Sequence, residues 1–293
     1  MSQDNTEISA KEAWGGGGSP VRLSYGKQMM WFFLISDALT FGGLLTSLGF
    51  MKHKFENIWP LCEEVFYHFP GVHAHWPLAY VALMTFILIV SSVTMVMAVE
   101  AGHRLDKQGV IKWLAATVIG GIIFLGSQAW EWDTFIRGNE ANSTAFVIPT
   151  DVTNVAHVKM VDHHTSFEGG DDAVASAIAK INSGEAVLQL ADRSEVSNAE
   201  AIAFLKESEQ IQGANMKRNE YGLPLYANFF FCITGFHGFH VFSGVVINLL
   251  ILIQVMRGQY DSRGHFEMVE KTGLYWHFVD LVWVFVFTFF YLI

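Results

Sequence analysis

The sequence predicts an all-α fold: a polytopic membrane helix bundle with five transmembrane helices and a soluble insertion between helices 3 and 4. Of the 293 residues, 52% are hydrophobic and only 16% are charged, whereas about a quarter of the residues in a soluble domain are charged. Five apolar stretches also reach the roughly 20 residues that a helix needs to cross a bilayer. They are Gln28 to Met51, Trp76 to Val99, Trp113 to Trp130, Leu225 to Met256 and Thr272 to Ile293.

Composition excludes several other classes of protein. The apolar stretches are continuous and lack the alternation of a membrane β-barrel. Only two cysteines occur, Cys62 and Cys232, and their predicted depths oppose a disulfide between them. A formal charge of −10 without clustered Lys and Arg argues against a nucleic-acid partner, because phosphate binding needs such clusters.

The predicted helices divide the chain into four parts. Residues 1–27 form an N-terminal tail with a flexible glycine linker at Gly15 to Ser19, and residues 28–130 hold helices 1 to 3. Residues 131–223 form an acidic extramembrane insertion, and residues 224–293 hold helices 4 and 5. The short loops on the side of the N-terminus carry nine Lys and Arg residues, against two in the loop from Lys52 to His75. Positive charge favours the cytoplasmic side, so we expect a cytoplasmic N-terminus and a C-terminus on the other side.

The insertion carries fifteen acidic and seven basic residues. We expect two short helices in it. The first follows Asp171 and Asp172 and ends near Gly184, and the second begins at Ser197, with Glu200 completing a capping box. The acidic surface either attracts a basic partner such as a small electron carrier or serves as a solvated cap over the bundle. The adjacent His163 and His164 are a weak signal for metal binding.

Two carboxyl groups lie inside predicted spans, Asp37 in the first and Asp280 in the last. Because a charged side chain at the bilayer centre costs about 2.5–3.5 kcal/mol, both should face protein. Either residue is part of a proton relay or is a neutral, hydrogen-bonded carboxyl that packs in the bundle.

Three histidines accompany these carboxyls. His237 and His240 are three residues apart in the fourth span, and His277 precedes Asp280 by three residues in the fifth. His237 and His277 satisfy the ligand count of a bis-histidine haem, whereas hydrogen bonding to Asp280, a carbonyl, water or a lipid headgroup is the alternative use of the same rings. Gln128 and Glu131 stand at the end of the third span, where polar groups anchor a helix at the interface. No nucleophile triad, phosphate loop, zinc spacing or dinucleotide motif occurs, so the chain lacks the parts of a stand-alone enzyme.

The last two spans resemble subunit III of the haem-copper cytochrome c oxidases. The resemblance lies in Gly235-Phe-His-Gly-Phe-His-Val-Phe-Ser-Gly and in Val269-Glu-Lys-Thr-Gly-Leu-Tyr-Trp-His-Phe-Val-Asp-Leu-Val-Trp. Weaker similarity covers Tyr25 to Phe41, where Asp37 takes the place of a family Glu, and Gln128-Ala-Trp-Glu131. The other residues at motif positions are His237, His240, Glu270, Tyr275, Trp276, His277, Asp280 and Trp283.

This resemblance implies an accessory, non-catalytic subunit of an aa3-type oxidase of the bacterial inner membrane. Such a subunit packs beside subunit I, in a complex with subunit II, and holds no haem or copper itself; haem a and copper belong to the partner subunits. It binds phospholipid in a V-shaped cleft, with helices 1 and 2 as one arm, and supports proton uptake and oxygen access while O2 is reduced to water. The chain departs from the family pattern in the shorter Asp37 and in its long insertion. Some members have seven helices, whereas the five seen here resemble the bacterial, five-helix form of the family.

Two alternatives remain at this point. The first is subunit III of a quinol oxidase, and the second is a membrane anchor that carries b-type haem. For the polar residues of the last two spans, we predict one layer of His237, His240, His277 and Asp280 that joins helices 4 and 5. For the insertion, we expect a contact with cytochrome c or another electron-donor complex.

Overall fold

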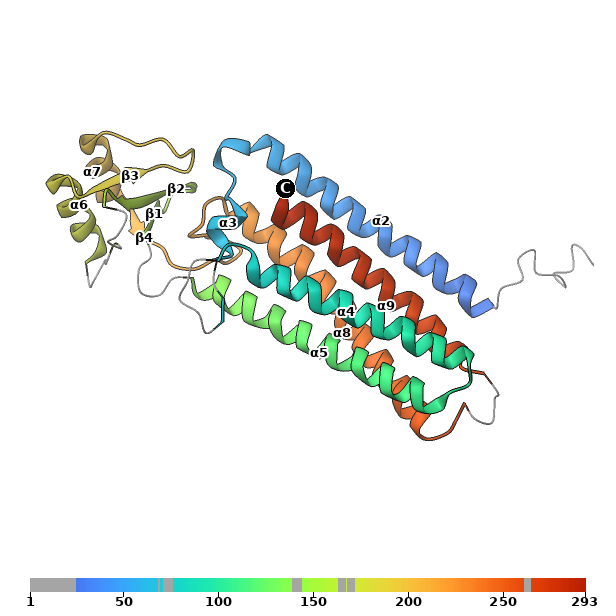
Figure 1. Cartoon of the computed structure of the whole chain (residues 1–293). Coiled ribbons are helices and arrows are strands. Elements are labelled where there is room, and N and C mark those ends of the chain that lie inside the picture. Colours follow the sequence, from blue (N-terminus) through green and yellow to red (C-terminus); the bar gives the residue numbers. More distant parts are fainter. Residues whose placement is uncertain are drawn as a thin grey trace, which may run out of the picture.

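Five long helices form the body of the protein in a computed structural model (Figure 1). The structure describes residues 25–67, 69–70, 76–138, 144–162, 167, 172–260 and 265–293, so the predicted glycine linker and the pair His163 and His164 lie outside it. The long helices are α2 (Tyr25–Lys54), α4 (Ala79–His103), α5 (Lys107–Arg137), α8 (Pro224–Met256) and α9 (Glu267–Val286). A π-helix, η2 (Phe287–Leu292), continues α9. All five are long and apolar enough to cross a membrane, which confirms the predicted helix bundle.

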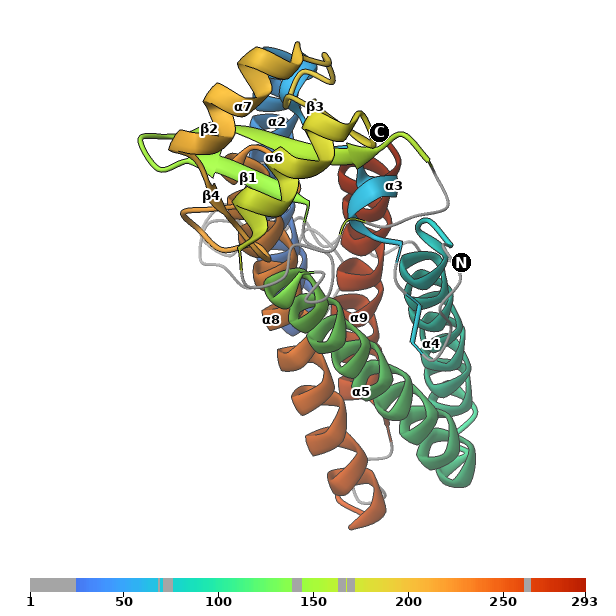
Figure 2. The ribbon, with the colours of Figure 1, turned by 90° about the vertical axis from the view of Figure 1, so that its left-hand side faces the viewer.

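Helix α9 is central in the bundle. It contacts α2, α4 and α8, while α5 packs along α4 and α8. The close packing of α4 on α5 depends on small residues, since a Cβ on Gly120 would lie 2.9 Å from the Cβ of Ser91. Helix α2 lies at the edge, against α9 and α8 (Figures 1 and 2). Helix α4 packs against α5 and α9, and the expectation that the first two spans form one arm of a cleft stays a prediction.

Short elements connect the spans. A 3-10 helix, η1 (Glu56–Ile58), and α3 (Cys62–Val65) lie between α2 and α4. The tight connection to α5 is stabilised by Asp106, whose side chain accepts a hydrogen bond from the Gly109 amide. Helix α5 continues to Arg137, beyond the predicted end at Trp130, and stops at Gly138 with φ of 65°.

The insertion is a small α/β unit placed over one end of the bundle (Figure 2), which we call the insertion end. Its strands β1 (Ala145–Ile148), β2 (Asp151–Met160), β3 (Ala186–Gln189) and β4 (Glu209–Gln210) form an antiparallel sheet in the order β3-β2-β1-β4. Helices α6 (Ala173–Ser183) and α7 (Asn198–Glu207) cover one face of this sheet.

The two helices of the insertion have the predicted caps. Asp172 accepts a hydrogen bond from the Ala175 amide, and Gly184 ends α6 with φ of 78°. Ser197 and Glu200 form both bonds of the capping box at α7. The sheet was not predicted from the sequence, because three of its strands have four residues or fewer and give no readable period-2 pattern.

Candidate functional site

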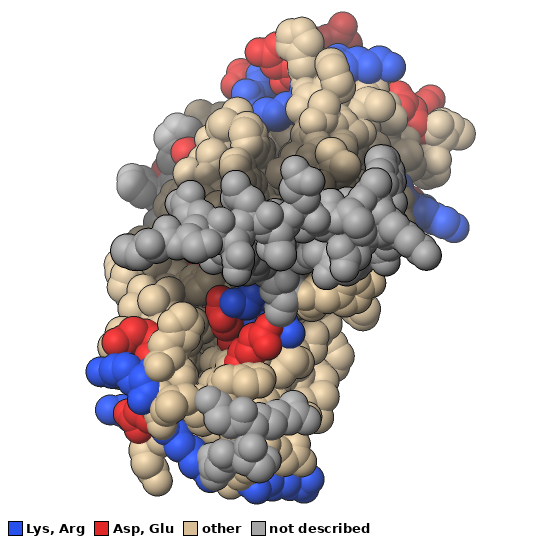
Figure 3. Space-filling model, turned by 90° about the vertical axis from the view of Figure 1, so that its right-hand side faces the viewer, with Lys and Arg blue, Asp and Glu red and all other residues tan. Residues whose placement is uncertain are grey.

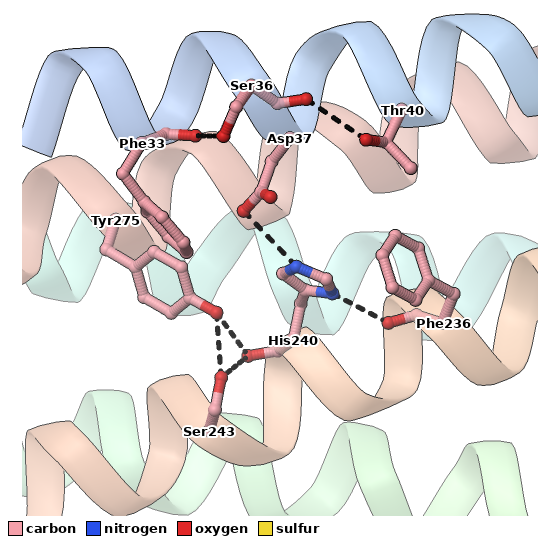
Figure 4. Close-up of polar contacts among 8 residues, drawn as sticks. All are labelled: Phe33, Ser36, Asp37, Thr40, Phe236, His240, Ser243 and Tyr275. Atoms are coloured by element: carbon pink, nitrogen blue, oxygen red, sulfur yellow. Dashed lines mark hydrogen bonds and ion pairs between the residues drawn. The ribbon is translucent and has the colours of Figure 1, made fainter.

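A buried ion pair connects α2 to the rest of the bundle. His240 on α8 places its Nε2 3.3 Å from Oδ2 of Asp37, and only 8% and 14% of these side chains are exposed. The His240 Nδ1 lies 2.8 Å from the Phe236 carbonyl, which can only accept, so Nδ1 carries a proton. The Nε2 and Oδ2 atoms lie within ion-pair distance, although Oδ2 accepts no hydrogen bond from the described residues. Figure 4 shows this arrangement.

Helix α9 adds a tyrosine to the same region. The Tyr275 hydroxyl donates to the His240 carbonyl at 3.2 Å and lies 2.7 Å from the Ser243 hydroxyl (Figure 4). The rings of Phe41 and Phe236 lie 5.4 and 4.6 Å from the His240 ring. Three helices therefore meet at one polar site that aromatic rings surround, which lowers its access to water and strengthens its electrostatic interactions.

The other histidines have different partners. His237 is fully buried and its Nε2 lies 3.1 Å from the Val279 carbonyl, which links α8 to α9. His277 lies 2.7 Å from the Ser92 hydroxyl on α4, and Ser92 also hydrogen-bonds Asp280. The four residues thus lie within about one helical turn of depth but do not form one layer between α8 and α9. His240 faces α2 and the pair of His277 and Asp280 faces α4, because α9 is surrounded by neighbours on several sides.

The separate partners of His237 and His277 argue against their use as the two ligands of a haem. His237 and His277 are directed at different helices, so they do not face a shared space. Within the described residues, no group of three His, Cys, Asp or Glu side chains is arranged to hold a metal ion.

Two tryptophans of the last motif have structural roles. The Trp283 indole donates to the Thr85 hydroxyl at 3.0 Å and joins α9 to α4. Trp276 lies against glycines of two helices, since a Cβ on Gly121 or Gly244 would approach its ring to 2.6 or 2.9 Å. Both residues fix α9 in the centre of the bundle.

A second buried carboxyl lies at the insertion end. Glu131 accepts from the Gln128 amide at 2.8 Å and from the Tyr291 hydroxyl at 3.1 Å, and Gln128 and Glu131 are 5% and 2% exposed. Their prediction as interfacial anchors was wrong, because Tyr291 on η2 comes from the far end of the chain and encloses them. Nearby, the Cys62 thiol contacts the Tyr226 hydroxyl at 3.1 Å, and burial raises the pKa of this thiol. Cys62 and Cys232 are not joined by a disulfide.

Two further contacts hold α2 at its ends. At the end opposite the insertion, Lys27 lies 2.7 Å from the motif residue Glu270. Figure 3 faces this end and shows acidic and basic side chains side by side. At the insertion end, the Lys52 ammonium contacts the carbonyl oxygen of Ile293. Neither Lys27 nor Lys52 was a candidate from sequence, since isolated lysines at helix ends carry no distinguishing pattern.

An apolar groove of about 680 Å³ lies between α2 and α9 with η2. It begins beside Asp37, at Ala38, and extends to His53. The residues on the α2 side include Gly42 and Gly49, around which an added Cβ would meet no atom within 4 Å. The volume is within the range of cavities that bind small organic molecules, and the lining is mainly apolar.

Comparison with known proteins identifies the same family as the motifs. The sequence profile of Cytochrome c oxidase subunit III matches residues 208–293. The chain is 24% identical to cytochrome c oxidase subunit 3 of Thermostichus vulcanus, over 89% of this chain and 84% of that protein. It is 27% identical to the subunit 3 of Pylaiella littoralis, over 64% and 68% of the two chains. A probable subunit 3 of Rickettsia conorii is 41% identical over 69 residues, which are 23% and 24% of the two chains.

Proposed function

Because this chain belongs to the cytochrome c oxidase subunit III family, we propose that it is the non-catalytic subunit III of an aa3-type terminal oxidase. In this role it stabilises subunit I, binds phospholipid, and supports proton uptake and oxygen access during the reduction of O2 to water. The observation that carries the proposal is the apolar groove between α2 and α9, which runs between two polar contacts, Asp37 with His240 and Lys52 with Ile293.

The groove suits one lipid orientation. Its lining is almost entirely apolar and suits an acyl chain. At the insertion end, the last turn of α2 carries Lys52, His53 and Lys54, whose side chains are suited to a lipid phosphate at headgroup depth. A phospholipid bound there would fill the groove between α2 and α9.

The exposed apolar surface of α2 supports an assembly role. Large side chains including Trp31, Phe32 and Phe50 are at least half exposed. Such a surface belongs against lipid or against another membrane subunit, and we propose subunit I as that partner, in a complex that also contains subunit II, haem a and copper.

The ionisable groups at the end opposite the insertion support the proposed link to proton uptake. Lys27 and His103 each lie within ion-pair distance of the Glu270 carboxylate, at 2.7 and 3.8 Å. Loop charges assign this end to the cytoplasm, so we place the protein in the bacterial inner membrane with the insertion and C-terminus on the periplasmic side. The acidic insertion is then available to a basic electron donor such as cytochrome c.

Filling the groove tests the lipid proposal. Gly42→Phe places a ring in the groove, where the glycine has free space, whereas Gly43→Phe is a matched control on the same helix that does not line the groove. We expect native mass spectrometry of the assembled oxidase to show one phospholipid fewer with Gly42→Phe, and its turnover to end sooner. Unchanged lipid content in Gly42→Phe, or equal loss in Gly43→Phe, would contradict the assignment of the groove.

A further inference from the structure

A second cavity, of about 360 Å³, lies between the insertion and the bundle. One wall is the face of the sheet that α6 and α7 leave uncovered, and the other consists of the α2 to α4 connection and the segment before α8. Figure 2 shows the sheet above the helix ends at this position. The groove between α2 and α9 shares none of these lining residues.

The register of the sheet gives this face its polar character. Alternation along β2 directs Ala156 and Val158 to α6 and α7, so His157 and Lys159 lie on the opposite side. His157 pairs with Gln189 of β3, and both line the cavity. Burial first, and the charge of Lys159 second, lower the pKa of His157 to about 4, so the ring is a neutral hydrogen-bonding group at neutral pH.

Two cations on this wall have no acidic partner within the described part of the chain. They are Lys159 and Arg193, whereas Arg137 pairs with Asp133 at 2.8 Å and Arg218 pairs with Glu209 at 2.5 Å. The cavity lining therefore holds two cations without an ion-pair partner among the described residues, along with the carboxyl groups of Glu64 and Glu220.

The acidic residues of the lining do not neutralise these cations. Glu220 is buried and accepts a hydrogen bond from the Gly213 amide at 2.6 Å, and Glu64 is exposed on α3. Neither forms an ion pair with Lys159 or Arg193.

Arg193 is held in an uncommon backbone conformation. Its φ is 66°, a region that few residues other than glycine adopt. The turn is fixed by the backbone amide of Leu190, which donates to the Ser194 carbonyl at 2.9 Å, and by the side-chain Nε2 of Gln189, which donates to the Arg193 carbonyl at 3.1 Å. The main chain from which this guanidinium extends is therefore well defined beside the cavity.

We propose that this cavity binds an organic phosphate, with Lys159 and Arg193 on the phosphate and the remainder of the molecule against Trp59, Leu61 and Tyr221. Two cations together with the donors of Gln189 and Thr144 suit an anion with three or more oxygens, and the volume exceeds that of a phosphate group. The phosphate comes from one of two sources: a phospholipid headgroup at the membrane surface or a soluble phosphate ester.

The experiment uses the full chain in neutral detergent. Phosphorus NMR follows line broadening of glycerol phosphate and of inorganic phosphate for wild type, Lys159→Gln, Arg193→Gln and the double variant. Lys206→Gln is the matched control, since Lys206 is exposed on α7 and outside the cavity. In parallel, native mass spectrometry after exchange into nanodiscs of phosphatidylglycerol measures phospholipid that stays bound. Circular dichroism verifies that each variant keeps its helices.

Each removed cation should weaken binding about tenfold or more, given the strength of hydrogen bonds to charged groups. Saturable binding of glycerol phosphate that the double variant loses supports a soluble ester, and retained phosphatidylglycerol that the double variant loses supports a headgroup. Absence of both signals in the wild type, or equal signals in wild type and folded double variant, overturns the proposal. Equal loss in Lys206→Gln overturns it as well, because binding would then depend only on overall charge. The Gly42→Phe groove variant should bind glycerol phosphate normally, and its loss of one phospholipid should add to the loss in the double variant, so the two sites are distinguished.

Discussion

Replacing Asp37 tests how α2 is held in the bundle. Asp37→Leu removes the contact with His240 and leaves the imidazole Nε2 without a partner in a site where only 8% of the His240 side chain is exposed. The lost interhelical contact costs about 0.6–2 kcal/mol, and the stranded nitrogen costs about 1–3 kcal/mol. We therefore expect the free energy of unfolding to fall by about 2–5 kcal/mol.

Two further variants distinguish the loss of the polar contact between Asp37 and His240 from the loss of side-chain packing. Asp37→Asn keeps a donor toward Nε2, because Nδ1 of His240 stays bonded to the Phe236 carbonyl, so it should cost at most about 1 kcal/mol. The double variant Asp37→Leu with His240→Phe removes both polar groups and should recover most of the loss, since replacing both partners of a buried pair with apolar groups is close to neutral.

The assay is reversible unfolding of the purified chain in mixed micelles with a rising fraction of sodium dodecyl sulfate, followed by circular dichroism. Hydrogen exchange of the α2 amides localises the effect to that helix. The reasoning is refuted if Asp37→Asn is as destabilising as Asp37→Leu, or if the two changes of the double variant are simply additive.

Three other predictions concern sites outside this pair. The pKa of His157 is about 4 in the folded insertion and about 6.5 in the unfolded chain, so the unfolded chain binds the proton first as the pH falls. The free energy of unfolding is therefore highest above pH 6.5 and decreases by up to about 3 kcal/mol toward pH 4. The difference between thermal unfolding profiles of wild type and His157→Gln across this range should show that loss, and superimposable profiles would contradict it. Ser197→Ala removes the α7 capping box and should lower the free energy of unfolding by about 1 kcal/mol, measured by chemical unfolding. Ser208→Ala, which removes no N-cap, is the control, and an equal effect of the two substitutions would argue against the cap. Gly121→Leu should prevent stable folding, because an added Cβ alone would approach Val245 and Trp276 to 2.5 and 2.6 Å. A Cβ on Gly126 would meet no atom within 4 Å, so Gly126→Leu should elute like the wild type on size-exclusion chromatography.

The sequence was sufficient for the helices but not for their neighbours. Apolar length predicted all five spans, and capping chemistry predicted both ends of α6 and the start of α7. Asp37 and His240 were both candidates, yet nothing in the sequence relates two residues so far apart in the chain to one another. The pairing depends on α2 lying against both α8 and α9, which is a property of the tertiary arrangement.

The least predictable contacts come from residues without a motif. Tyr291 encloses Glu131 only because η2 returns to the end of α5, and a terminal tyrosine in an apolar run resembles an interfacial anchor. The insertion shows the same limit, since its strands are too short for a periodic pattern. Its cavity arises only when β2 and β3 pair and place His157 beside Gln189.

The way α2 is attached explains how a groove can exist in a bundle. Lipid chains are as apolar as leucine, so packing and hydrogen bonds determine which membrane helices associate. Helices α4 and α5 associate through small residues in close contact, and such contact leaves no space between them. Helix α2 is held instead by polar contacts at three levels: Lys27 with Glu270, Asp37 with His240, and Lys52 with Ile293. Contacts at separate points fix the position of a helix without requiring apolar contact along its whole length, and the stretch between the second and third contacts is where the groove lies. A helix sealed against α9 along this stretch would be more extensively packed, but it would have no room for a lipid.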